Sequence, residues 1–220
     1  MTERLSDTAY VRAQYAGVER LATRAAVWAP VPGTAEPITD LIGRIVSSAP
    51  RAIIEIGCGT GALAARIVDA LPSVHYLATD QSAAMVEAPR RQGLTVARAS
   101  AERLPVASDS ADIVIAAWML YHVGDVDAAL AEVCRVLRPG GRLFAMTNGD
   151  DHLADLLRDA GGERIITQFS RENGQRILRR HFPEVRQRDF ESLATFPDHA
   201  AATAYLRSFD PQLAQGLPHF

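Results

Sequence analysis

The stretch Ile53-Ile54-Glu55-Ile56-Gly57-Cys58-Gly59-Thr60-Gly61 decides the fold of this chain. It begins with an apolar run typical of a buried strand, and three glycines spaced two apart then lead into a helix. Glycine at a strand-to-helix turn tolerates positive φ and lets a ligand approach the backbone where a Cβ atom would clash. The stretch therefore predicts a loop that holds a cofactor.

The chain around this loop alternates between predicted strands and helices from Arg51 to Thr147. Such alternation predicts right-handed βαβ units and a parallel sheet. Ligands of these sheets lie beyond the carboxyl ends of the strands, at the point where the strand order reverses. Candidate site residues should therefore be sought in the loops that follow each strand.

Four further segments occur in a fixed order after the glycine loop. Asp80 follows an apolar strand at 74–79, the turn Ser100-Ala101-Glu102-Arg103-Leu104-Pro105 comes next, a strand is expected at 112–117, and Arg138-Pro139-Gly140-Gly141 separates a helix from the next strand. Together these motifs resemble the class I S-adenosylmethionine (SAM) dependent methyltransferases, in particular their small-molecule, type 11-like branch. The resemblance covers roughly residues 50–147.

The resemblance implies an α/β fold of the Rossmann-like, doubly wound kind, with a mostly parallel, seven-stranded-type sheet. It implies a helical lid at 1–48 and a SAM-binding core at 49–220, with a helical insertion at about 151–183. Residues Asp210 to Phe220 contain two prolines and a glycine and are unfavourable for a central strand, so we expect the last strand to be missing or truncated, or the edge of the sheet to be built differently.

The same resemblance implies a set of cofactor contacts. Asp80 would bind the two ribose hydroxyls, and Glu55 would accept from the cationic amino end of SAM. The full set is Glu55, Gly57, Cys58, Gly59, Gly61, Asp80, Gln81, Met85, Ser100, Ala101, Glu102, Ala116 and Ala117. The product would be S-adenosylhomocysteine.

Ser100 departs from the family pattern, because many relatives carry an acid there that accepts from the adenine amino group. A neutral hydroxyl makes a weaker contact than a carboxylate. Adenine recognition is therefore expected to depend on the Ala101 backbone, with Glu102 or Asp109 as possible substitutes.

A nicotinamide dinucleotide is the rival ligand, because Gly57, Gly59 and Ala62 also satisfy the pattern of dinucleotide-binding loops. Two observations favour SAM. Glu55 would lie unfavourably near a pyrophosphate, and all 23 basic residues are arginine, so no lysine can donate a proton or anchor that cofactor.

The acceptor side is expected in the loop Trp118-Met119-Leu120-Tyr121-His122-Val123. His122 titrates in the useful range and is the first candidate base, and Tyr121 is the second catalytic candidate. His122 could instead only support the loop, and Tyr121 could be a pocket wall. The acceptor pocket is expected to include Tyr10, Tyr15, Trp118, Met119 and Asn148.

Composition limits the remaining possibilities. The chain has 220 residues, 48% hydrophobic content and a net charge of -3, which suits one α/β domain and gives no reason to expect nucleic-acid or membrane binding. Neither the two cysteines nor the six histidines have metal-ligand spacing, so no metal is expected. We expect a cytoplasmic monomer or homodimer that methylates an O, N or C atom of a small molecule. An RNA or protein methyltransferase, or a protein that binds SAM without turnover, is the alternative.

Overall fold

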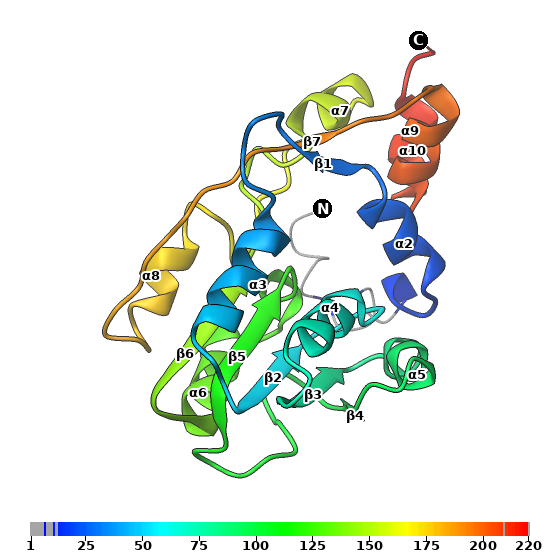
Figure 1. Ribbon diagram of the computed structural model, residues 1–220. Helices are drawn as coiled ribbons and strands as arrows, with labels where there is room; N and C mark the ends of the chain where they lie inside the picture. The colour runs from blue at the N-terminus through cyan, green and yellow to red at the C-terminus, as the bar shows by residue number, and fades with distance from the viewer. Residues whose placement is uncertain (1–6, 8–10, 12, 209, 220) are drawn as a thin grey trace.

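A computed structural model describes residues 7, 11, 13–208 and 210–219 of the chain. Its centre is a parallel five-stranded sheet with the order β4-β3-β2-β5-β6 (Figure 1). The strands are β2 (Ala52–Ile56), β3 (His75–Asp80), β4 (Val96–Arg98), β5 (Ala111–Ala117) and β6 (Leu137–Met146). The order reverses between β2 and β5, so a ligand site is expected beyond their carboxyl ends.

Helices cover both faces of this sheet. The connecting helices are α3 (Pro37–Ser47), α4 (Ala62–Ala70), α5 (Ala83–Arg91) and α6 (Val126–Val136). Successive side chains along each strand point to opposite faces of the sheet, so the core consists of two clusters. Ile53 and Ile113 pack with Leu41 and Ile45 of α3, whereas Ile54 and Val114 belong to a second cluster that includes α6. The predicted Rossmann-like parallel fold is therefore confirmed.

At the end of the sheet opposite the expected ligand site, the side chain of Asp112 connects neighbouring strands. Its Oδ2 atom accepts hydrogen bonds from the backbone N–H groups of Arg51 (2.8 Å) and Ala52 (2.9 Å) at the start of β2. Its Oδ1 atom lies 2.6 Å from Nη1 of Arg138, which precedes the glycine pair of β6. These contacts connect β2, β5 and the edge strand β6 at the end of the sheet opposite the ligand-binding edge.

The C-terminal part of the chain does not complete a seven-stranded sheet. After β6 come α7 (Ala154–Asp159), α8 (Gly174–Leu178), β7 (Ser192–Ala194), α9 (His199–Arg207) and α10 (Pro211–Gly216). The segment 185–196 forms only the short strand β7, which pairs antiparallel with β1 (Trp28–Pro30) in a separate two-stranded sheet. In the described residues the main sheet thus has five strands, and the final strand of the family pattern is replaced by α10.

The N-terminal segment contributes to two parts of the molecule. Helix α3 packs on the sheet, whereas α2 (Glu19–Ala25) lies on the other side of the molecule, beside α9 and α10 (Figure 1). No helix among the described residues is long and apolar enough to cross a bilayer.

Candidate cofactor and acceptor site

The glycine loop connects β2 to α4 in a conformation that glycine favours. Gly57, Gly59 and Gly61 have φ values of 70°, 54° and 81°. A Cβ atom on Gly57 would lie 2.7 Å from Cβ of Met119, and one on Gly59 would lie 2.8 Å from Cδ2 of Leu21. Both the backbone angles and the close approach of these side chains therefore require glycine in the loop.

Asp80, at the end of β3, lies directly beside this loop. Its Oδ2 atom accepts from the N–H of Gly59 at 3.1 Å, and its Oδ1 atom accepts from the N–H of Ser82 at 2.9 Å. Burial raises the pKa of Asp80, and these backbone N–H groups oppose that rise. A carboxylate offers about four acceptor positions, so the group retains capacity for a hydroxyl donor.

Glu55 is placed differently from Asp80. Its side chain is only 2% exposed, and its Oε2 atom accepts a 2.8 Å hydrogen bond from the hydroxyl of Tyr76. Burial raises the pKa of Glu55 to about 7, against the hydrogen bond from Tyr76. In this structure the residue is part of the core under the loop, and its contact with the amino group of SAM stays a prediction.

The loop after β4 holds the residues expected around adenine. The Ser100 hydroxyl lies 3.1 Å from Oε2 of Glu102, both residues are exposed, and Ala101 is buried. Glu102 is therefore available beside Ser100. Asp109 is not, because it precedes the amino end of β5 and bonds through its N–H to the carbonyl of Arg135, at the opposite edge of the sheet.

The other predicted cofactor residues divide into core and surface positions. Cys58, Met85 and Ala116 are 7%, 0% and 0% exposed, and burial raises the pKa of the Cys58 thiol. Ala117 is half-buried at the end of β5, and Gln81 is exposed in the turn after β3. Side-chain contacts with a ligand are thus open to Gln81, whereas Cys58 and Met85 support the loop from beneath.

The acceptor-side residues meet around Tyr15. The Tyr15 hydroxyl lies 2.8 Å from Nε2 of His122 in the 3-10 helix η2 (Leu120–His122), and the Tyr15 carbonyl accepts from the hydroxyl of Ser82 at 2.7 Å. The Tyr121 and His122 rings contact edge to face, with centroids 4.4 Å apart. Burial raises the pKa of the Tyr121 phenol well above its usual range, so this hydroxyl stays protonated at neutral pH. Tyr15 thus connects the N-terminal segment to both sides of the predicted cofactor position.

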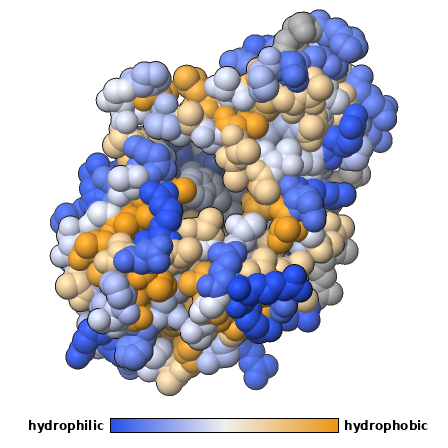
Figure 2. Space-filling view, turned by 45° about the vertical axis from the view of Figure 1, so that its right-hand side comes forward, coloured by the Kyte–Doolittle hydropathy of each residue, from blue (hydrophilic) through white to orange (hydrophobic). Residues whose placement is uncertain are grey.

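A cleft of about 2350 Å³ begins at these residues and continues along the open edge of β6. Tyr15, Trp118, Tyr121, His122 and Asn148 all line it, whereas Met119 packs on Gly57. The candidate Tyr10 lies outside the described residues. The surface is hollowed on the face shown in Figure 2, and apolar residues lie beside the hollow.

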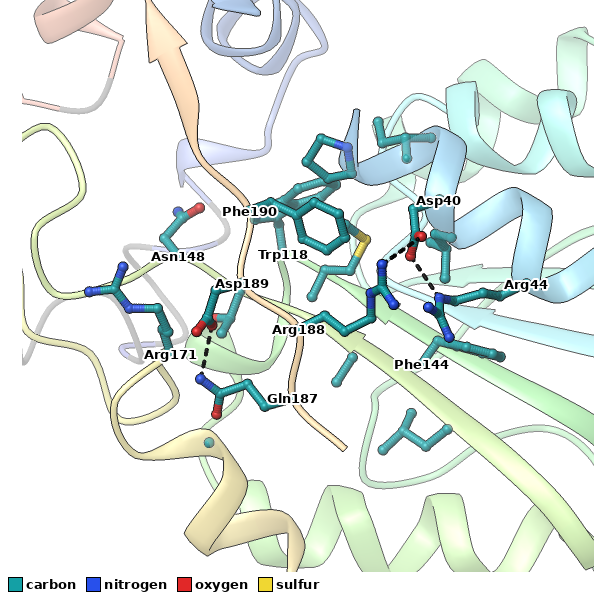
Figure 3. A pocket seen from close by; sticks show the side chains of 18 of the residues that line it. Asp40, Arg44, Trp118, Phe144, Asn148, Arg171, Gln187, Arg188, Asp189 and Phe190 are labelled. Carbon is teal, nitrogen blue, oxygen red and sulfur yellow. Dashed lines mark hydrogen bonds and ion pairs between the residues drawn. The ribbon is translucent and has the colours of Figure 1, made fainter. Parts of the chain in front are cut away.

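The far part of the cleft is bounded by the segment after α8 (Figure 3). Arg188 of this segment reaches Asp40 of α3, with 3.2 Å between Nη2 and Oδ1, and Arg44 binds the other oxygen of Asp40 at 2.7 Å. The cleft exceeds the roughly 300–1,000 Å³ typical of small-ligand pockets. In the part of the chain that the structure describes, β6 is the last strand of the main sheet, so its outer edge stays open to the cleft.

Three further residues of the cleft were not predicted from the sequence as site residues. Trp28 stacks on His152 with ring centroids 4.9 Å apart, while Arg24 and Tyr205 line the same region. Burial lowers the pKa of His152 to about 4, so its imidazole is neutral at pH 7. No local motif marks Arg24, Trp28 or Tyr205, and their approach depends on how α2 and α9 pack in three dimensions.

The comparisons with known proteins agree with this geometry. The family model described as a methyltransferase domain matches residues 54–145. The ubiquinone/menaquinone biosynthesis C-methyltransferase UbiE of Rhizobium johnstonii is 32% identical over 71% of this chain and 70% of its own length. The malonyl-[acyl-carrier protein] O-methyltransferase of Methylococcus capsulatus is 35% identical over 49% of this chain and 41% of its own length.

Two solved structures share the fold. The [4+2]-cyclase SpnF has a TM-score of 0.58 at 21% identity over 93% of this chain and 80% of its own, and YcgJ of Bacillus subtilis has a TM-score of 0.51 at 24% identity over 65% and 68%. The chain belongs to the type 11 family of class I methyltransferases. It spans only 41%, 37% and 57% of the length of three malonyl-[acyl-carrier protein] O-methyltransferases that it resembles.

The cofactor of this family is SAM, and the residues present fit it. The glycine loop supplies a backbone surface free of Cβ atoms, and the adjacent Asp80 carboxylate has unused acceptor capacity. Leu21 and Met119 pack against the glycines, so we expect the side chain of Leu21 to move when a ligand occupies the loop.

Proposed function

We propose that this protein transfers the methyl group of SAM to an O, N or C atom of a small molecule. The contact between the Asp80 carboxylate and the Gly59 N–H carries the proposal, because it places a hydroxyl-binding group against the glycine loop. The methyltransferase names of the relatives, UbiE of Rhizobium johnstonii in particular, support the same reaction. Bound SAM supplies the activated methyl group.

The protein's own part in this reaction is mainly to align the two reactants. Met119 and Trp118 follow β5 at the edge where the acceptor enters, and the N-terminal segment covers the site through Tyr15. Alignment and exclusion of water can supply effective molarities of about 10⁵ to 10⁸ M. A base is needed only for an acceptor that must lose a proton.

His122 is the group proposed to take that proton. Its ring lines the cleft, and the Tyr15 hydroxyl at Nε2 fixes its orientation. For a hydroxyl acceptor, the oxygen would form its bond to the methyl carbon as the carbon–sulfur bond of SAM breaks, S-adenosylhomocysteine would leave, and the hydroxyl proton would pass to the imidazole. Tyr15 acts as a positioning residue in this scheme.

The test is transfer of radiolabelled methyl groups from SAM to a panel of phenols, amines, carboxylic acids and quinols. Label in an organic-soluble product, with equal release of S-adenosylhomocysteine, is the expected result. Label only in protein or RNA would assign the alternative acceptor classes. Tight SAM binding without label transfer to any class would indicate a binding protein.

A further inference from the structure

The Arg24 guanidinium has one buried nitrogen that lacks a hydrogen-bond acceptor among the described residues. That atom is Nη2, whereas Nε donates to the carbonyl of Arg20 at 3.2 Å. Among the described residues no carboxylate forms an ion pair with Arg24. A buried N–H of a charged group without an acceptor is unfavourable, because the group has lost its water.

Two aromatic side chains of the cleft, Tyr15 and Tyr205, interact with this guanidinium. Its Cζ atom lies 5.1 Å from the centre of the Tyr15 ring, the residue whose hydroxyl contacts His122. Burial raises the pKa of Tyr205 to about 12, and the nearby charge of Arg24 opposes that rise. Arg24, Trp28 and Tyr205 line the cleft together with Tyr15. The cation thus lies in a part of the cleft that contains three aromatic side chains, and Tyr15 stands between it and the candidate base.

We propose that Arg24 binds a carboxylate on the methyl acceptor, so that the substrate class is an apolar or aromatic carboxylic acid. The inference rests on the proposed function and names the substrate of that same site. A guanidinium presents paired N–H donors that match the two oxygens of a carboxylate. A single cation among aromatic rings suits one negative charge, whereas a phosphate dianion would call for a second cation. The rings would pack against the apolar body of the acid.

Matched acids and amides test the proposal without knowledge of the natural acceptor. Protein saturated with S-adenosylhomocysteine is titrated with 4-hydroxybenzoate and 4-hydroxybenzamide, with octanoate and octanamide, and with phenyl phosphate, and binding is followed by ligand-observed NMR. We expect at least one acid to bind at least tenfold more tightly than its amide. The Arg24→Gln variant should lose this preference, and Arg24→Lys should keep only part of it.

Arg20→Gln is the matched control, because Arg20 is exposed on the same helix and does not line the cleft. It should keep the full preference for the acids. Equal binding of acids and amides by the unaltered protein, a preference that survives Arg24→Gln, or tighter binding of phenyl phosphate than of either acid would overturn the inference. Binding of S-adenosylhomocysteine is measured first. Its absence in the unaltered protein would refute the proposed function, whereas its presence without a preference for acids would refute only the role of Arg24.

Discussion

Two acidic side chains near the glycine loop have different surroundings and different expected roles. Asp80 is turned toward the loop and accepts from two backbone N–H groups, whereas Glu55 is buried beneath the loop against Tyr76. The first is placed to bind a ligand. The second is placed to affect stability.

Replacement of Asp80 by alanine should weaken SAM binding by about 1.5 to 3 kcal/mol, the range for hydrogen bonds to a charged group. Calorimetric titration of the variant, with circular dichroism to confirm folding, measures this loss. Asp80→Asn should retain part of the affinity, because one side-chain oxygen remains. A folded Asp80→Ala protein with unchanged affinity would show that the acid does not contact the cofactor.

Glu55 should make the stability of the protein depend on pH. Its folded pKa of about 7 lies above the ordinary 4.5, so the folded state binds the extra proton and is favoured at low pH. This contribution is fully present below about 4.5 and is lost as the pH rises through 7. It amounts to roughly 3 kcal/mol, on the order of 1.4 kcal/mol per pKa unit.

The isosteric variant Glu55→Gln stays neutral and can still accept from Tyr76, so its free energy of unfolding should lack this fall with pH. Urea titrations at pH 4.5 and pH 7.5 compare the two proteins. His152, whose pKa is lowered to about 4, makes stability rise with pH and so acts against the fall expected from Glu55. It is present in both proteins, so it does not affect the comparison. Parallel pH profiles for the variant and the unaltered protein would contradict the neutral, buried state of Glu55.

His122 is expected to act on the chemical step. With a hydroxyl or ammonium acceptor, His122→Ala should lower turnover by about 10² to 10⁴ with little change in SAM affinity, the effect of losing a general base. The rise of rate with pH that accompanies deprotonation of the base should also disappear. Tyr15→Phe should have a smaller effect, because it removes the hydrogen bond and keeps the ring. Full turnover in His122→Ala would return the residue to a supporting role.

Helix α2 is the element that connects the two halves of the site. Leu21 packs against Gly59 of the glycine loop, and Arg24, one turn later in the helix, lies over the ring of Tyr15 in the cleft. None of the residues of this helix is buried. An element with so little buried surface can move at low cost, as the entry of a cofactor requires.

Truncation of Leu21 should therefore alter the kinetics of cofactor binding. Leu21→Ala should speed SAM association, because less side chain has to leave the loop, and should also speed dissociation, because less covers the bound molecule. Stopped-flow fluorescence measures both rates. Leu193→Ala, a change at a leucine that is 51% exposed in β7, serves as the control. Unchanged rates in Leu21→Ala would show that α2 does not cover the cofactor.

Across the whole molecule, the sequence predicted the parts that depend on local chemistry. The glycine loop, the acid after β3 and the order of the parallel strands follow from short motifs whose glycines and apolar runs permit few alternatives. The C-terminal half was harder to predict. The segment Val185-Arg186-Gln187-Arg188-Asp189 carries too many charges for a central strand, and an ion pair to Asp40 holds it beside the sheet instead.

The acceptor side could be predicted only in part, because some of its residues meet only through tertiary packing. His122, Tyr121 and Trp118 were found because they follow a predicted strand. Arg24 and Tyr205 are about 180 positions apart in the sequence and meet only through the packing of α2 and α9, which no local pattern encodes.

Calorimetric titration of the unaltered protein with SAM and, separately, with NADH tests the cofactor assignment most directly. We predict saturable heat with SAM and a dissociation constant in the micromolar range, on the order of 8 kcal/mol of binding free energy, with little heat from NADH. Saturable binding of NADH without binding of SAM would contradict the assignment of this site to methyl transfer.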